Sequence, residues 1–196
     1  MSFISDSQLR SYRKSVQLSY KTLNESLREF KAESKYFKTK IFLSHKHDEL
    51  EHLEGAISFL KNHGVEVYVD WLDDGMPKTT SGVTAVRIKE KIKENDKFIF
   101  LATEAAINSK WCNWELGLGD AAKYINNIAI LPIRKDNIEF SGSEYLQIYP
   151  YIVHYDDYKY ELDGDLFGYW KPGTYVVFPK SKGNERVISL SDWLKS

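Results

Sequence analysis

The sequence predicts an α/β protein with an open, mostly parallel five-stranded sheet that has helices on both faces. Short apolar runs alternate with segments whose apolar residues recur every three or four positions. The first pattern is typical of parallel strands buried on both faces, and the second is typical of the helices that cover them. The composition agrees, because 196 residues with 42% hydrophobic and 28% charged residues can bury a sizeable core.

The predicted strands are five apolar runs whose lengths fit strands better than helices. They cover residues 40–45, 65–69, 98–101, 128–133 and 151–155. The second run begins directly after Gly64, so the helix before it returns straight to the sheet, as in a β-α-β unit. A further strand is expected at 174–178, followed by a turn at 182–184.

Three helices are expected between these strands. Asp48 is the predicted N-cap of the first helix, with Glu51 at the third position in a capping-box spacing, and Gly64 ends that helix. The second helix covers about residues 83–94. Ser109 begins the third, because its hydroxyl can accept hydrogen bonds from the unpaired amides of a first turn.

The chain is expected to have three parts: an N-terminal helical extension at 1–38, an α/β domain at 39–160, and a C-terminal extension at 161–196 packed on that domain. Residues 6–38 contain no Gly or Pro, and their apolar residues are three, four or seven apart, which predicts one long helix. Its narrow apolar stripe could pack on the domain, pair with a second copy or hold a partner.

Composition excludes several classes of function. The net charge of −1 gives no electrostatic case for nucleic acid, although residues 1–40 total +5 and the remainder −6. A single cysteine, Cys112, rules out an internal disulfide framework and fits a reducing compartment. No signal peptide is recognisable, and no stretch approaches the ~20 apolar residues of a membrane span. We therefore expect a cytoplasmic protein without membrane or nucleic-acid partners.

Three segments that can carry chemistry follow consecutive strands. Ser44 and His45 end the first strand, a loop at 70–82 follows the second, and residues 109–115 follow the third. The loop contains one Pro and two Gly, and loops of this length are usually functional or mobile. Because ligands bind outside the carboxyl ends of open parallel sheets, we expect the three segments to form one site.

The helix after Ser109 places Trp111 and Glu115 four residues apart, on one face. Gly119 on the same face leaves room beside the carboxylate, while the stripe through Trp114 is expected to pack in the core. A carboxylate beside an indole suits a flat, partly cationic ligand. The other interpretation is that Trp111 only packs and Glu115 is a solvated helix charge.

These segments resemble a Toll/interleukin-1 receptor (TIR) domain over residues 38–160. The resemblance rests on Ile41-Phe42-Leu43-Ser44-His45, on Asp70-Trp71 and, most specifically, on Ser109-x-Trp111-Cys112-x-x-Glu115. It implies a flavodoxin-like fold and an NAD-cleaving bacterial type of TIR protein, similar to those of Thoeris anti-phage immunity.

The resemblance also implies roles for individual residues. Glu115 matches the glutamate that is catalytic in NAD-cleaving members, and Trp111 matches the aromatic residue that lines their site. The segment from Asp70 to Gly82 corresponds to the BB loop, which covers the site and contributes to self-association.

The chemistry of NAD⁺ fits such a site. Cleavage of the nicotinamide–ribose bond passes through an oxocarbenium-like state, and the nicotinamide leaves as a neutral molecule. One carboxylate, Glu115, is therefore enough to offset the developing charge, and an aromatic face favours the cationic ring. The expected substrate-binding residues are Ser44, His45, Asp70, Trp71, Lys78, Ser109 and Trp111.

The expected products are nicotinamide and ADP-ribose, or a cyclic or conjugated ADP-ribose-derived signal for a separate effector protein. NAD⁺ is then the substrate, and no cofactor is expected. One alternative is a non-catalytic signalling adaptor that binds other TIR domains. The other is a metal hydrolase built on His45-x-His47-Asp48, but no later His/Asp cluster completes a metal sphere, so no metal is expected.

Overall fold

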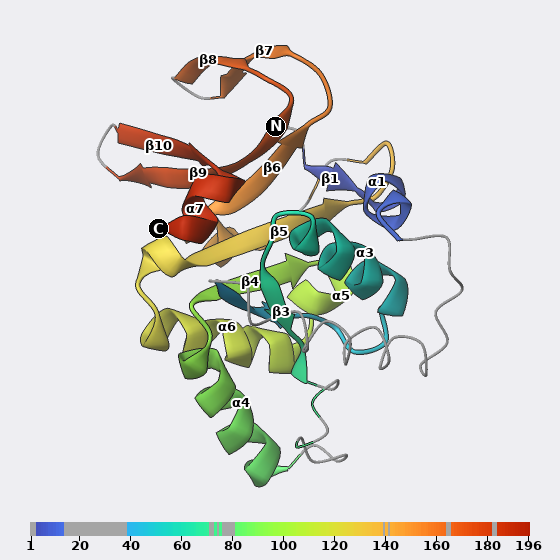
Figure 1. Ribbon diagram of the computed structural model, residues 1–196, viewed down its shortest axis with the longest axis vertical. Helices are drawn as coiled ribbons and strands as arrows, with labels where there is room; N and C mark the ends of the chain where they lie inside the picture. The colour runs from blue at the N-terminus through green and yellow to red at the C-terminus, as the bar shows by residue number, and fades with distance from the viewer. Residues whose placement is uncertain are drawn as a thin grey trace.

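Five parallel strands form the centre of the computed structural model (Figure 1). They are β2 (Lys40–Ser44), β3 (Glu66–Tyr68), β4 (Lys97–Ala102), β5 (Ile128–Arg134) and β6 (Tyr151–Tyr155), in the spatial order β3-β2-β4-β5-β6. The five predicted strands are thereby confirmed. The structure describes residues 3–13, 39–70, 73, 75, 81–138, 140, 142–163, 166–181 and 184–196.

The complete sheet is larger than the five strands predicted. Strand β1 (Ile4–Ser5) pairs in parallel with the end of β5, while β9 (Gly173–Ser181) and β10 (Asn184–Ser189) extend the sheet antiparallel beyond β6, giving eight strands. Strands β7 (Lys159–Asp163) and β8 (Leu166–Trp170) form a separate hairpin. The further strand expected at 174–178 is confirmed as part of β9. Strand β1, with two residues, is too short to show periodicity, and β10 is an addition to the predicted strands.

Helices cover both faces of the sheet. One face packs against α3 (Leu50–Lys61) and α7 (Leu190–Lys195), and the other packs against α4 (Gly82–Glu94), α5 (Glu104–Ile107) and α6 (Lys110–Ala122). Among the residues that the structure describes, none of the helices has the length and apolar character needed to cross a membrane.

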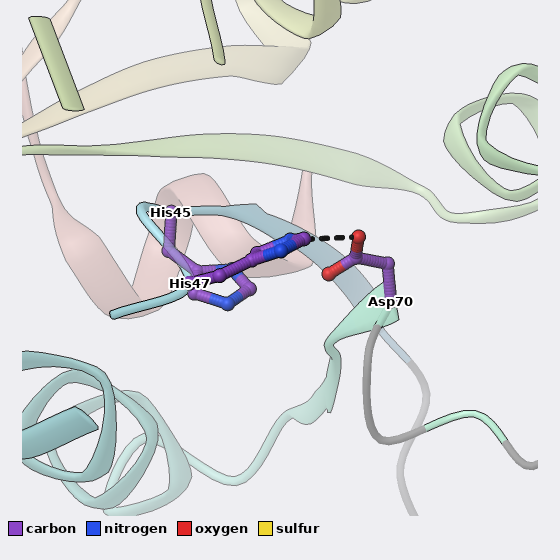
Figure 2. A group of neighbouring side chains, drawn as sticks. All are labelled: His45, His47 and Asp70. Atoms are coloured by element: carbon purple, nitrogen blue, oxygen red, sulfur yellow. Dashed lines mark hydrogen bonds and ion pairs between the residues drawn. The ribbon is translucent and has the colours of Figure 1, made fainter. Parts of the chain in front are cut away.

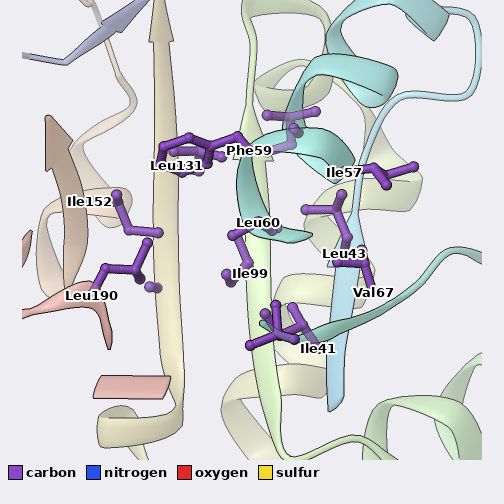
Figure 3. Close-up of a cluster of buried hydrophobic side chains, with 14 of the residues drawn as sticks. Ile41, Leu43, Ile57, Phe59, Leu60, Val67, Ile99, Leu131, Ile152 and Leu190 are labelled. Atoms are coloured by element: carbon purple, nitrogen blue, oxygen red, sulfur yellow. The ribbon is translucent and has the colours of Figure 1, made fainter. Parts of the chain in front are cut away.

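The strands divide their side chains between two cores. Ile99 and Leu101 of β4 join the cluster under α3 (Figure 3), whereas Phe98 and Phe100 join the cluster under α6. This alternation follows from the two-residue period of a strand. Because both sets are apolar, the runs are apolar throughout, which is why they were recognisable in the sequence.

The N-terminal segment departs from the expected long helix. Helix α1 (Asp6–Ser11) begins at a Ser5 capping box and ends at Ser11, with Tyr12 as its C-cap. The prediction of one continuous helix over 6–38 is therefore wrong. Residues 14–38 lie outside the described part of the chain. The described segment packs on the domain, because Ile4 and Leu9 are fully buried and Arg10 pairs with Glu51 of α3 at 2.5 Å.

The first helix after β2 begins later than predicted. Glu49, not Asp48, occupies the N-cap of α3, and no side chain caps it. Asp48 is exposed and pairs with Lys46 at 3.0 Å. The division at residues 38 and 160 stays a prediction, while the flanking segments contribute β1, α1, β9, β10 and α7 to the same sheet and cores.

The contact between α1 and α3 predicts that replacing two helical glycines by alanine has different effects on stability. A Cβ added at Gly55 would overlap the carbonyl oxygen of Leu9, whereas one added at Gly117 of α6 meets no atom within 4 Å. Gly55→Ala should lower the free energy of unfolding by about 2 kcal/mol, since overpacking exceeds the gain in helix propensity. Gly117→Ala should leave it unchanged or raise it. Equal melting temperatures for the two variants would show that α1 does not pack on α3.

Candidate active site

A buried hydrogen bond joins the end of β2 to the middle of α6. The two-residue period of β2 places Ser44 on the same face as Phe42, which is the face that α6 covers. The hydroxyl of Ser44 donates to Oε2 of Glu115 at 2.6 Å, and the two residues are 1% and 2% exposed. The structure thus brings together two of the residues singled out in the sequence.

The burial of α6 is the reverse of the predicted one. Its buried residues are Cys112, Glu115, Leu116 and Gly119, while Trp114 is 37% exposed. Gly119 leaves no room beside the carboxylate, because a Cβ there would lie 3.0 Å from the ring of Phe98. The small residue therefore allows α6 to approach β4 closely. The interpretation of Glu115 as a solvated helix charge is also wrong.

The surroundings of Glu115 favour its neutral form. Burial, followed by the negative charge of Asp70, raises the pKa of Glu115 to about 8, although hydrogen bonds to Ser44 and Trp111 act in the opposite direction. Asp70 is 5% exposed and is the second residue after β3. A carboxyl group with such a pKa can exchange its proton near neutral pH, as groups at functional sites often do.

The start of α6 is fixed by two further hydrogen bonds. Ser109 caps the helix as predicted, its hydroxyl accepting from the amide of Cys112 at 3.3 Å. The thiol of Cys112 donates to the carbonyl of His45 at 3.2 Å. Burial raises the pKa of this thiol to about 11, so Cys112 is a tie between α6 and the residue after β2, not a thiolate nucleophile.

His45 is buried at the same junction. It is 3% exposed, and burial lowers its pKa to about 4, so the ring is neutral at physiological pH. Nδ1 lies 3.1 Å from the carbonyl oxygen of Leu43 and must donate to it. Within the described part of the chain, the buried Nε2 has no hydrogen-bond partner, an arrangement that usually costs about 1–3 kcal/mol.

A second histidine faces Asp70 (Figure 2). Nε2 of His47 lies 3.1 Å from Oδ2 of Asp70, and this carboxylate raises the pKa of His47. The ring of His47 lies 5.2 Å from that of His45, measured between centroids. Asp48, which the metal-hydrolase alternative combined with these histidines, pairs with Lys46 instead. Sequence reasoning missed the link between His47 and Asp70, which only the neighbouring positions of β2 and β3 could have indicated.

Two cavities are candidates for a ligand-binding site. The smaller, of about 210 Å³, is lined by His45, Lys46, His47, Ser109, Trp111 and Cys112. The larger, of about 690 Å³, lies around α5 and α1. Its cations are engaged, because Arg10 pairs with Asp6, Lys135 pairs with Glu104, and Arg134 donates to the carbonyl of Phe3. The smaller one is lined by His45, His47 and Cys112, whose pKa values are shifted, whereas Ser44, Asp70 and Glu115 are not among its lining residues. Trp111 both lines this cavity and bonds to Glu115, so we take the cavity together with the Ser44–Glu115 pair as the candidate site. Of the predicted residues, Trp71 and Lys78 lie outside the described part.

Comparison with known proteins decides the family. A family model described as TIR domain matches residues 41–163. The chain belongs to the TIR family. This TIR protein is also 31% identical over 165 residues to a protein of Bacillus cereus (strain MSX-D12) named "Probable 3' cyclic ADP-D-ribose synthase ThsB'". The similarity covers 77% of this chain and 82% of that protein, and it confirms the resemblance seen in the sequence.

The raised pKa of Glu115 predicts a pH-dependent effect on stability. Between the unfolded pKa of about 4.3 and the folded pKa of about 8, the unfolded chain has lost this proton and the folded TIR protein keeps it. Stability therefore falls as pH rises through this window and levels above it. Glu115→Gln removes this loss, so its melting temperature relative to the parent should be higher at pH 8.5 than at pH 5.

The control is Glu90→Gln, which removes an exposed glutamate of α4. Its melting temperature should follow that of the parent at both pH values. If the Glu115→Gln difference is the same at pH 5 and pH 8.5, the carboxyl does not titrate abnormally in the folded protein.

Proposed function

We propose that this TIR protein cleaves the nicotinamide–ribose bond of NAD⁺, with Glu115 as the catalytic carboxylate. The observation behind the proposal is that a buried carboxyl group in the middle of α6 is held by the hydroxyl of Ser44, the last residue of β2. From β2 the chain continues to β3 on one side, and from β3 it crosses to β4 on the other side of β2. Ligands of open α/β sheets bind at such a reversal of strand order, here between β2 and β4.

Each neighbouring group suits one part of this chemistry. When the C–N bond breaks, nicotinamide takes the electron pair and leaves neutral, and positive charge develops on the ribose. The Glu115 carboxylate would oppose that charge in a site that excludes water, where such interactions are strongest. The half-buried ring of Trp111 lines the pocket and would pack on the nicotinamide. Ser109 and His45 line the same pocket and would contact the ribose.

The pocket would hold only part of the dinucleotide. Its volume of about 210 Å³ is below the roughly 300–1,000 Å³ of pockets for drug-sized ligands. The nicotinamide and its ribose would occupy it, and the pyrophosphate and adenosine would extend beyond it. Asp70, Trp71 and Lys78 are proposed to contact those parts from the segment between Asp70 and Gly82.

We propose a cyclic ADP-ribose as the product, in keeping with the printed name of the Bacillus cereus relative. A nucleophilic oxygen or nitrogen of the same ADP-ribose would form the new bond to the ribose carbon as the bond to nicotinamide breaks, and it would lose its proton. Attack by water would give linear ADP-ribose instead. We further propose that the product acts on a separate effector protein in bacterial anti-phage defence, and that TIR domains associate through residues 70–82.

The second candidate function is a non-catalytic adaptor that binds other TIR domains. Purified protein would then leave NAD⁺ intact, and replacement of Glu115 would not alter any small-molecule product. The burial of Glu115 and its hydrogen bond to Ser44 favour the enzyme, because a carboxyl group without a chemical role is rarely kept fully buried away from a cation.

Glu115→Gln should lower the rate of NAD⁺ cleavage by at least ~10²–10³-fold, since the amide keeps the volume but lacks the charge. The assay is mass spectrometry of NAD⁺, nicotinamide and ADP-ribose products after incubation with purified full-length protein. Glu90→Gln should retain parental turnover. A folded Glu115→Gln variant that cleaves NAD⁺ like the parent would exclude Glu115 as the catalytic group.

The pH dependence of turnover should report the same carboxyl group. Because the ionised form is needed, kcat/KM for NAD⁺ should rise about tenfold per pH unit below its apparent pKa, which is about 8 for Glu115, and then level. Trp111→Phe keeps a ring but removes the indole donor that lowers this pKa, so the profile should move to higher pH. Trp114→Phe, on the exposed side of α6, should leave it in place; equal shifts in both variants would contradict the assignment.

A further inference from the structure

We infer that His45, His47 and Asp70 form a binding site for a transition-metal dication of the Zn²⁺ class. Each residue offers one ligand atom, and these three atoms lie within 4.8 Å of one another. Imidazole nitrogens with one carboxylate oxygen are a donor set that suits Zn²⁺, Co²⁺ or Ni²⁺. The inference goes beyond NAD⁺ cleavage and does not depend on it.

The hydrogen bonding of His45 prepares it as a ligand. Since its Nδ1 donates to the carbonyl of Leu43 at 3.1 Å, the proton is fixed there and Nε2 presents a lone pair. This nitrogen is buried and has no hydrogen-bond partner among the described residues. Metal-bound histidines usually donate their other ring nitrogen to a carbonyl or carboxylate in this way, which fixes the tautomer and the ring orientation.

The other two ligands can reach an ion with small movements. Tetrahedral Zn²⁺ with bonds of about 2.0–2.2 Å needs ligand atoms about 3.3–3.5 Å apart, somewhat closer than the 4.8 Å limit found here. The side chain of His47 is 49% exposed and can turn towards His45, and its Nε2 is already 3.1 Å from Asp70. Figure 2 shows the side chain of His47 directed at Asp70 with the ring of His45 beside it; the histidines come from the segment after β2, and Asp70 from the second position after β3.

Charge and access also favour a dication. Asp70 and Glu115 are two carboxyl groups buried close enough for each to affect the other, and Glu115 bonds to the neutral donors Ser44 and Trp111. The ammonium of Lys46, which lies between the two histidines in sequence, pairs with Asp48 at 3.0 Å.

The cluster is also accessible. Both imidazoles line the pocket of about 210 Å³, so an ion can enter from solvent. Three protein ligands would leave a fourth position open towards that pocket.

The test is titration of the tag-free, chelator-treated full chain with Zn²⁺ alone, followed by calorimetry, and with Co²⁺ alone, followed by its visible absorption. We expect one ion per chain and a Co²⁺ spectrum of tetrahedral type. His47→Ala, at a half-exposed side chain, should weaken Zn²⁺ binding at least tenfold, as should Asp70→Asn. The matched control is His63→Ala, a histidine outside the cluster, which should bind Zn²⁺ like the parent.

Circular dichroism of each variant checks that it is folded. The inference is overturned if the parent binds no Zn²⁺, if both cluster variants bind as tightly as the parent, or if His63→Ala weakens binding as much as His47→Ala does. NAD⁺ takes no part in these titrations, so their failure would leave the proposed cleavage untouched. Conversely, if the protein binds Zn²⁺ but leaves NAD⁺ intact, the metal site is supported and the proposed cleavage is not.

Discussion

The hydrogen bond from Ser44 to Glu115 is the constraint on which the site depends. It crosses the boundary between sheet and helix, and it holds a carboxyl group that burial alone would exclude from this position. The thiol of Cys112 makes a second bond across the same boundary, to the carbonyl of His45. Together they fix α6 against the end of β2. Gly119 permits the close approach that both bonds require, since any side chain there would meet Phe98.

The fold was predictable because its physical pattern is simple. Each central strand is apolar on both faces, as Phe98 and Ile99 illustrate by entering different cores, and such runs are distinctive in a sequence. Elements without that pattern were missed. Strand β1 has two residues and α5 has four, which is too short for any periodicity. The length of the first helix was overestimated because an apolar stripe cannot show that a chain turns at Tyr12.

The sequence indicated which segments carry the candidate site, but not which face of α6 is buried. Spacing correctly placed Trp111 and Glu115 on one face of α6. The face with Glu115 also contains Cys112 and Gly119, which contribute little hydrophobicity. Hydrophobicity therefore favoured the opposite stripe, through Trp114, as the core. The structure buries the first stripe because Ser44 supplies a donor for the carboxylate, and a contact 71 positions away in sequence cannot be read from helical periodicity. The pairing of His47 with Asp70 was missed for the same reason.

Two buried features of this site have unfavourable free energies. The raised pKa of Glu115 corresponds to a penalty on the order of a few kcal/mol for the ionised form. The buried Nε2 of His45, which has no hydrogen-bond partner among the described residues, adds another penalty. A stability of 5–15 kcal/mol is typical of a whole domain, so such terms are large. Both groups lie within one junction of β2, β3 and α6, and this concentration of unfavourable polar burial is characteristic of a place where stability has been given up for binding or chemistry.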